Sequence, residues 1–366
     1  MSVARRNMMA GKGRTLLSVA GVAIATLLLL FVVGLYRGWN DGLVRYIRET
    51  RADVWVVGTG ADSFFTPSIL FNSSLVDVRQ TPGVTDMTSI IGKPMNIRRG
   101  PDSWQTYVIG FDTSAAGGPV EVSQGSGTPK FGEIVIDDVL ARTSGLGIGD
   151  EVRVGTASLK VAGISKGGNL VLAQLSFVNM DQGRRSVLGI DAIVNFALLQ
   201  TEPGRSHEVV DAINRNVPGV TAFDSATFAD NSQAVLHRSV LPILLVIVLL
   251  AVVVGTIVVG LTVYTGVVEK EREFGVLKAL GQTASGLCRV VFEQSLICGI
   301  AGFAVGLGST YLVSWAASVV IPQVTTVVRW QDVLLVLAAT AIMSLVAGLL
   351  PMQRVVRVDT LSVFKA

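Results

Sequence analysis

The chain has 366 residues, of which 50% are hydrophobic and 16% are charged. Soluble domains carry about 25% charged residues, so this composition and a mean hydropathy of +0.57 exclude an ordinary soluble protein. The net charge is only +3, and the long segment 37–238 contains slightly more acidic than basic residues. Proteins that bind nucleic acid carry an excess of basic residues on one surface. This chain has no such excess in its long segment, so we exclude nucleic acid as a partner.

Four long runs without a charged residue dominate the sequence. A helix needs about 20 apolar residues to cross the bilayer core, and each run is at least that long. The alternative is a set of buried helices in a large soluble core, but such helices rarely continue so far without charge. The sequence therefore predicts four membrane helices, at residues 15–36, 239–266, 285–318 and 332–352.

Charges beside these spans predict the topology. Four basic residues and no acid precede the first span, and basic residues exceed acids after the last one. Because Lys and Arg favour the cytoplasmic side, we expect a multi-pass protein of the bacterial cytoplasmic (inner) membrane with both termini in the cytoplasm.

The remaining segments follow from this topology. Residues 1–14 form an amphipathic cytoplasmic segment that either lies on membrane lipid or only sets the topology. The other predicted segments are an outer domain at 37–238, a cytoplasmic helix at 267–284, an outer loop at 319–331 and a cytoplasmic tail at 353–366.

The outer segment has the pattern of an α+β domain. Strands are predicted at 53–58, 84–91 and 192–199, with short helices at 74–80 and 206–216 that are each followed by Pro-Gly-Val. This order suggests two βαβ-like halves, with chance recurrence of Pro-Gly as the equal alternative. Between the halves, strands at 133–137, 151–154 and 158–162 predict an inserted β subdomain. Helical spacing at 39–50 and 223–238 predicts two stalk helices.

The sequence predicts neither a cofactor nor a metal site in this chain. The nucleotide-binding pattern Gly-x-x-x-x-Gly-Lys-Ser/Thr is absent, so we expect no ATP hydrolysis by the chain itself. His207 and His237 have no Cys or His at ligand spacing. The Gly-x-Ser-x-Gly pattern of serine hydrolases is absent as well, and a membrane-anchored enzyme is a minor alternative.

Four residues in or beside the spans are candidates for function or packing. Glu293 lies inside the third span, where a carboxylate is often functional, or it reaches the interface together with Arg289. His237 stands at the mouth of the second span, where it either binds haem, senses pH or faces lipid headgroups. Gly302 and Gly306 have the Gly-x-x-x-Gly spacing that favours close helix contact.

A charged block separates the second and third spans. Residues 267–281 read Val-Val-Glu-Lys-Glu-Arg-Glu-Phe-Gly-Val-Leu-Lys-Ala-Leu-Gly. From Glu269 onward the block resembles the signature of ABC transporter permeases of the MacB, LolC/LolE and FtsX superfamily, which is close to Glu-x-Arg-x-x-x-Gly-x-Leu-x-Ala-x-Gly. The layout of one span, a large outer domain and three more spans is similar as well. Residues 52–57 and the phenylalanines at 64 and 65 are similar to the HrtB/DevC-like branch, which is a less specific match.

The resemblance implies a permease subunit that works with a separate cytoplasmic ABC ATPase. Two copies of the ATPase would bind ATP-Mg and dock on the charged block, which would act as a coupling helix. The permease would form a homodimer or a heterodimer with a sister permease. The residues implied to dock on the ATPase are Glu269, Arg272, Glu273, Phe274, Gly275, Leu277, Lys278 and Gly281.

The function implied by the resemblance is mechanotransmission that exports or extracts a hydrophobic or amphipathic substrate. Haem, a lipid, a lipoprotein or a drug would each fit, and a membrane-fusion or other extracytoplasmic partner stays open. The alternative is a non-transporting signal relay that activates an extracytoplasmic partner such as a cell-wall hydrolase.

Overall fold

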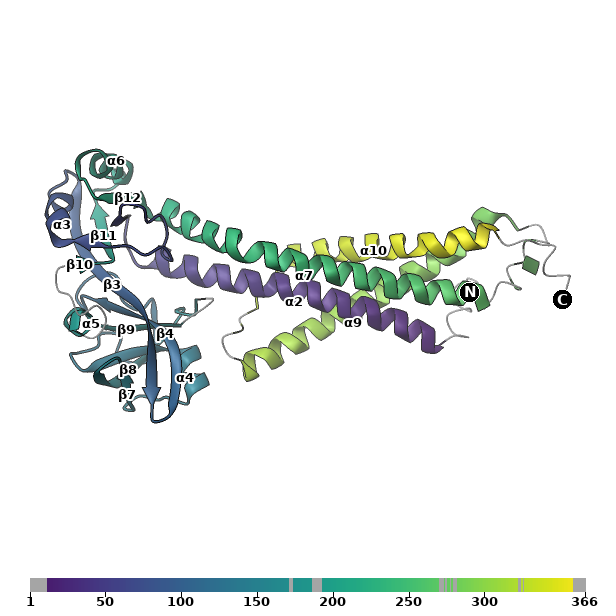
Figure 1. Cartoon of the computed structure of the whole chain (residues 1–366), viewed down its shortest axis with the longest axis horizontal. Coiled ribbons are helices and arrows are strands. Elements are labelled where there is room, and N and C mark those ends of the chain that lie inside the picture. Colours follow the sequence, from purple (N-terminus) through teal and green to yellow (C-terminus); the bar gives the residue numbers. More distant parts are fainter. Residues whose placement is uncertain are drawn as a thin grey trace. The chain divides into compact units, whose positions relative to one another are not determined.

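The chain divides into two compact units, shown with the whole chain in Figure 1. The helical unit comprises Met1–Arg37, Pro242–Val319 and Thr325–Ala366, and the α+β unit comprises Gly38–Leu241 with Val320–Val324. The computed structural model describes residues 12–170, 174–185, 193–269, 273, 275, 276, 278, 282–321, 324 and 326–357. Most of the segment predicted at 1–14 and the end of the tail predicted at 353–366 therefore lie outside the described residues.

Four long helices carry the apolar runs. They are α2 (Lys12–Glu49), α7 (Ser225–Glu269), α9 (Ala284–Val320) and α10 (Trp330–Arg357). Each contains a stretch that is long and apolar enough to cross a membrane, which confirms the four predicted membrane helices. Helices α2 and α7 each continue without a break into the α+β unit as a stalk.

Buried apolar side chains hold the helical unit together. One cluster contains residues of all four helices, among them Val22 of α2, Val259 of α7, Val291 of α9 and Met343 of α10. Because these side chains come from distant parts of the sequence, burying them fixes the helices as one bundle.

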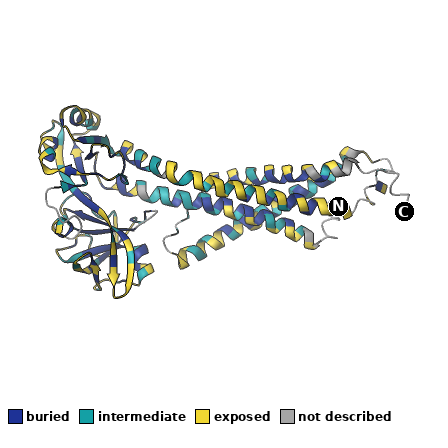
Figure 2. Ribbon diagram, viewed as in Figure 1, coloured by how far each residue is buried: buried dark blue, intermediate teal, exposed yellow. Residues whose placement is uncertain are grey.

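Large apolar side chains are also exposed on the outside of this bundle. Figure 2 shows exposed residues along α7, and they include Leu249, Ile257 and Leu261, each about 60% exposed. A continuous exposed apolar face marks a surface that meets lipid or another protein. The four helices therefore have the surface expected of membrane helices.

The first half of the α+β unit is a four-stranded sheet with two helices on one face. Its antiparallel strand order is β12-β1-β11-β3, and side chains of both helices pack against Val54 and Val56 of β1. Each helix connects two strands that lie one strand apart, so the half has the split βαβ topology of ferredoxin-like folds. The elements are β1 (Val54–Gly58), α3 (Asn72–Arg79), β3 (Val84–Arg99), β11 (Phe196–Thr201), α6 (Ser206–Asn216) and β12 (Val220–Asp224).

The second half is a closed six-stranded barrel, made of the second part of β3 and five strands that follow β3 in the sequence. Neighbouring strands pair in the order β3-β4-β9-β6-β8-β7, and β7 pairs with β3 again to close the ring. Buried aliphatic side chains such as Ile97, Val108 and Val161 fill the interior. The barrel strands besides β3 are β4 (Asp102–Phe111), β6 (Glu133–Asp137), β7 (Glu151–Val154), β8 (Ala157–Lys166) and β9 (Gln174–Asn179).

In the described part of the α+β unit, three short strands and two short helices accompany these two halves. Strand β5 (Glu121–Gly125) pairs with β8 outside the ring, and β2 (Leu70–Phe71) pairs with β10 (Ile193–Val194). The short helices are α4 (Asp138–Ser144) and α5 (Met180–Gly183). An α+β domain between the first span and the other three is thus confirmed.

A buried carboxylate ties α4 to the barrel. Asp137 is fully buried, and its Oδ1 accepts the Val139 N–H at 2.9 Å as the cap of α4. Its Oδ2 accepts the Gly168 N–H at 3.0 Å, which fixes the loop after β8. Burial raises the pKa of Asp137 to about 7, against the opposing effect of these hydrogen bonds.

Candidate functional site

The charged block that resembles a coupling helix is described only in part. Helix α7 ends at Glu269 and α9 begins at Ala284. Between them Glu273, Gly275 and Lys278 are helical, with Glu273 exposed and Gly275 buried. Four other predicted docking residues lie outside the described residues, namely Arg272, Phe274, Leu277 and Gly281.

Glu293 and His237 lie on different helices, α9 and α7. Glu293 lies on α9 one turn after Arg289, and the two side chains form an ion pair at 3.5 Å. Their side chains are 37% and 81% exposed, so the pair lies on the surface of the helical unit. His237 is exposed on α7. Among the described residues, no group of three His, Cys, Asp or Glu side chains is arranged to hold a metal ion.

Gly302 and Gly306 lie where α9 packs directly on α2. A Cβ atom added to Gly302 would meet the side chain of Val22 and come within 2.9 Å of the Val19 carbonyl oxygen. A Cβ atom on Gly306 would lie 2.7 Å from the Ala23 carbonyl oxygen. The two glycines therefore allow a backbone approach that a larger residue would prevent.

Replacing either glycine with alanine is expected to separate α9 from α2. Gly302→Ala and Gly306→Ala should each lower the stability of the purified protein by about 1–3 kcal/mol, the usual cost of overpacking a buried contact. Gly308→Ala is the matched control, because an added Cβ there meets nothing within 4 Å. Thermal unfolding in detergent measures the effect, and equal melting temperatures for all three variants would contradict the close contact.

A buried ion pair joins α2 to α10. The Nε and Nη2 groups of Arg37 donate to Asp332 Oδ1 at 2.9 and 2.7 Å, and the Asp332 side chain is only 5% exposed. Asp332 Oδ2 also accepts the Arg329 N–H at 3.1 Å in the first turn of α10, where the helix dipole favours an acid. The sequence did not reveal this pair, because its members are 295 positions apart and neither stands in a recognisable motif.

An apolar groove of about 310 Å³ lies between α2 and α7 in the helical unit. Glycine, alanine and aliphatic side chains line it, including Ile24 and Leu28 of α2 and Leu250 and Val254 of α7. With no polar side chain in its lining, the groove suits a lipid tail, another apolar ligand or a second helix.

The stalk ends of α2 and α7 meet the sheet of the α+β unit in one aromatic core. Tyr46 of α2, Trp55 of β1 and Phe228 of α7 are all fully buried there. Trp55 stacks on Phe228 with ring centroids 4.8 Å apart, and Tyr46 packs edge-on against Phe64 at 5.7 Å. Aromatic contacts of this kind fix both helix ends firmly to the sheet.

Comparison with known proteins gives two family matches and several relatives. Residues 15–226 match the MacB-like periplasmic core domain, and residues 245–360 match the C-terminal part of FtsX-like permeases. The uncharacterised ABC transporter permease Rv2563 of Mycobacterium tuberculosis is 24% identical over 350 residues, which cover 95% of this chain and 94% of the relative. The uncharacterised permease Rv0072 of the same species is 25% identical over 368 residues, which cover 99% and 98% of the two chains.

Two solved structures also resemble part of this chain. The extracellular domain of the noncanonic ABC-type transporter YknZ from Gram-positive bacteria aligns with a TM-score of 0.36 and 13% identity, over 47% of this chain and 99% of that chain. The periplasmic region of MacB from Actinobacillus actinomycetemcomitans aligns with a TM-score of 0.38 and 10% identity, over 50% and 94%. The match to the MacB-like core domain alone covers more than half of the chain. The protein therefore belongs to the MacB/FtsX superfamily of ABC transporter permeases, a family that lacks ATPase activity of its own.

Proposed function

We propose that this permease works with two copies of a separate cytoplasmic ATPase to move a hydrophobic or amphipathic substrate such as haem, a lipid, a lipoprotein or a drug. The termini and the segment 267–284 are cytoplasmic in this proposal, and the α+β unit lies outside the membrane. ATP-Mg is bound by the ATPase, which docks on the segment around Glu273.

The observation that carries the proposal is the continuity of α2 and α7. Each is a single helix that includes a membrane-length apolar stretch and has one of its two ends in the α+β unit, where Tyr46 and Phe228 are buried in the aromatic core. A helix without a break transmits displacement along its axis. Force applied at the cytoplasmic ends of these helices would therefore reach the α+β unit.

The apolar groove between α2 and α7 supports an apolar substrate or a second permease chain. Its lining offers no hydrogen-bond partner, and the exposed face of α7 beside it is aliphatic. A homodimer or a heterodimer with a sister permease would cover this face, with membrane lipid around the rest. A purely relaying permease has no need of such a groove, so we place transport before the activation of an extracytoplasmic partner such as a cell-wall hydrolase.

Reversing a charge in the coupling segment tests the proposal. Glu273→Arg should leave membrane insertion and thermal unfolding unchanged but lower co-purification and stimulated ATP hydrolysis of the ATPase at least about tenfold, a loss of about 1.4 kcal/mol in docking free energy. Glu273 is exposed, so its side chain lies at the surface of the coupling segment. The measurement uses the full chain purified from native membranes with its bound ATPase and reconstituted in nanodiscs.

The matched control is Glu151→Arg, which reverses an exposed acid on β7 in the other unit. Normal ATPase binding and hydrolysis in Glu273→Arg, or an equal loss in the control, would contradict docking at this segment. The compound that stimulates ATP hydrolysis then distinguishes transport from the signal relay. Stimulation by haem or a lipid supports transport, whereas stimulation only by a captured extracytoplasmic protein supports the relay.

A further inference from the structure

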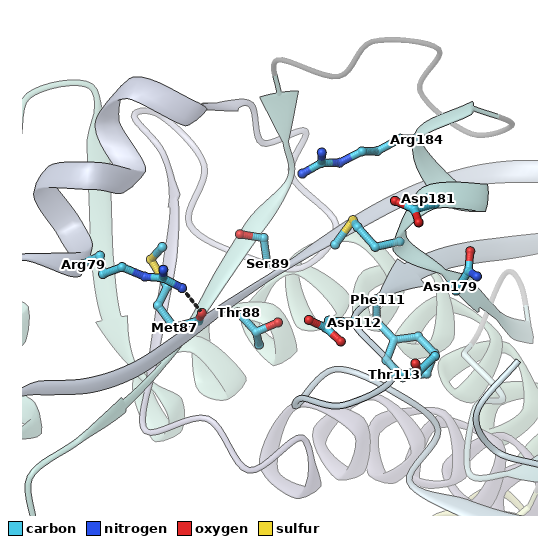
Figure 3. Close-up of a pocket in the computed structure, with 11 residues that line it drawn as sticks. Arg79, Met87, Thr88, Ser89, Phe111, Asp112, Thr113, Asn179, Asp181 and Arg184 are labelled. Atoms are coloured by element: carbon cyan, nitrogen blue, oxygen red, sulfur yellow. Dashed lines mark hydrogen bonds between the residues drawn. The ribbon is translucent and has the colours of Figure 1, made fainter. Parts of the chain in front are cut away.

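A polar pocket of about 480 Å³ opens in the α+β unit, between the end of α3, the first half of β3 and the region of β9 and α5. Two basic and two acidic side chains line it (Figure 3). Arg79 ends α3, Asp112 directly follows β4, Asp181 lies in α5 and Arg184 follows α5. Ligand pockets usually measure about 300–1,000 Å³, so the pocket has room for a small molecule.

The four charges do not neutralise one another. No salt bridge joins any of these four described residues to another, and Arg184 Nε is buried without a hydrogen-bond partner. Arg79 Nη2 donates to the Met87 carbonyl oxygen at 3.0 Å, which orients the guanidinium group. The four charged side chains therefore surround the pocket without forming salt bridges to one another, and a bound ligand can pair with them.

The charges surround the pocket from different sides. Figure 3 shows the guanidinium groups of Arg79 and Arg184 pointing toward its middle from opposite walls, with the hydroxyl group of Ser89 between them. The Asp112 carboxylate points in from below in the same view. Asp112 Oδ1 accepts the N–H and Oγ–H of Ser114 at 2.9 and 2.7 Å, and these bonds lower the pKa of Asp112 so that it stays ionised.

A ligand with a single charge fits this arrangement poorly. An anion would gain hydrogen bonds from the two arginines, which bind oxyanions well, but it would be repelled by two carboxylates. A cation would be attracted by the two carboxylates but repelled by the two arginines. A ligand that carries both charges satisfies both pairs, and Ser89 and Asn179 add neutral hydrogen-bonding groups to the same wall.

We propose that this pocket binds a small zwitterion, with its ammonium group toward Asp112 and Asp181 and its oxyanion, a carboxylate or a phosphate, toward Arg79 and Arg184. The proposal goes beyond the permease function and does not depend on it, because binding is measured without an ATPase. A failure of this site would therefore leave the coupling experiment on Glu273 unaffected.

The test is calorimetric titration of the full chain in nanodiscs made only of phosphatidylglycerol, so that no zwitterionic lipid competes. Triglycine is the first probe, and glycerophosphoethanolamine is the second, which separates a peptide-like source from a lipid headgroup. We expect saturable binding of at least one of them. N-acetyl-triglycine lacks the ammonium charge of triglycine, and triglycine amide lacks its carboxylate charge. Each should bind at least tenfold more weakly than triglycine.

Variants assign the binding to the pocket. Arg184→Gln and Asp112→Asn should each weaken binding at least tenfold, while Arg184→Lys should retain part of it because the positive charge stays. Arg98→Gln and Asp102→Asn remove exposed charges of the same kinds outside the pocket and should bind as the unaltered protein does. Thermal unfolding shows which variants fold, and Asp112→Asn decides the result if Arg184→Gln does not fold.

Three results would overturn the proposal. The first is the absence of saturable binding by both zwitterions. The second is binding of N-acetyl-triglycine or triglycine amide as tight as that of triglycine, since the pocket would then recognise only one charge. Equal weakening in the pocket variants and in the two control variants would place the site elsewhere and overturn it as well.

Discussion

Replacing Phe228 with alanine is expected to destabilise the α+β unit by about 3–5 kcal/mol, the range for truncating a large buried aromatic side chain. Phe228 is fully buried. It stacks on Trp55 and lies edge-on to Phe196, with ring centroids 4.8 and 6.1 Å apart. The substitution would leave a cavity between the base of α7 and the sheet, and the surrounding rings can fill it only in part.

Hydrogen exchange of the backbone amides measures this effect locally. In Phe228→Ala, the amides of β1 and of the first turns of α7 should exchange faster, because the cavity lowers the free energy of local opening. Phe71→Ala is the matched control, since Phe71 is 59% exposed and its loss should change stability by less than about 0.5 kcal/mol. Unchanged exchange in β1 of the Phe228 variant would show that the aromatic core does not hold α7 to the sheet.

The same core has a functional consequence under the proposed mechanism. Phe228→Ala should keep ATPase docking, because the substitution is far along the chain from Glu273, but it should reduce the response of the α+β unit to ATP. The variant would then separate docking from transmission. A loss of both together would indicate a general folding defect instead.

The regular elements of the α+β unit were predictable because their signals are local. The strand at 133–137 is a run of three β-branched apolar residues between two acids, and the strand at 151–154 alternates polar and apolar residues. The helix at 206–216 has an apolar face, and all three observed elements have the predicted bounds. Strand β9 was missed, since its buried positions include Gln174 and Ser176. The Thr106 Oγ1 atom lies 2.8 Å from Ser176 Oγ, and this cross-strand contact lets a polar residue occupy a position where alternation predicts an apolar one.

Strand β3 was predicted to end at 91 but continues to Arg99. Gly92 and Pro94 argue against a continuing strand, yet the second half of β3 pairs with β4 in the barrel. Long-range pairing outweighs the local signal at this point. Closure of the barrel is likewise not visible in the sequence, because it depends on pairs such as Ile97 with Val154.

The sequence indicated a candidate site only where the residues are contiguous. The charged block around Glu273 was singled out by its resemblance to the signature of the MacB, LolC/LolE and FtsX superfamily, and its docking role stays a prediction. The aromatic core, the polar pocket and the Arg37–Asp332 pair each combine residues from separate elements. Nothing in the local sequence of these residues indicates their partners, so they required the tertiary structure.

The ion pair between Arg37 and Asp332 leads to the second large prediction. Asp332 is almost completely buried and accepts both hydrogen bonds from the Arg37 side chain on one oxygen. Arg37→Met would leave that carboxylate buried without its cation. Removing one member of a buried pair costs about 3–5 kcal/mol, and we expect about 3 kcal/mol here because 32% of the Arg37 side chain is exposed to solvent.

Removing both charges should be less harmful than removing the cation alone. In Arg37→Met/Asp332→Asn no charge stays buried, and the asparagine oxygen can still accept the Arg329 N–H in the first turn of α10. The double variant should therefore unfold at a higher temperature than Arg37→Met, with a coupling energy of about 1.5–3 kcal/mol in a double-mutant cycle. Arg45→Met is the control, because Arg45 forms only exposed ion pairs, with Glu49 and Glu121, and should lose at most about 1 kcal/mol. If the effects of Arg37→Met and Asp332→Asn simply added, the two side chains would be acting independently and the pair would not fasten α2 to α10.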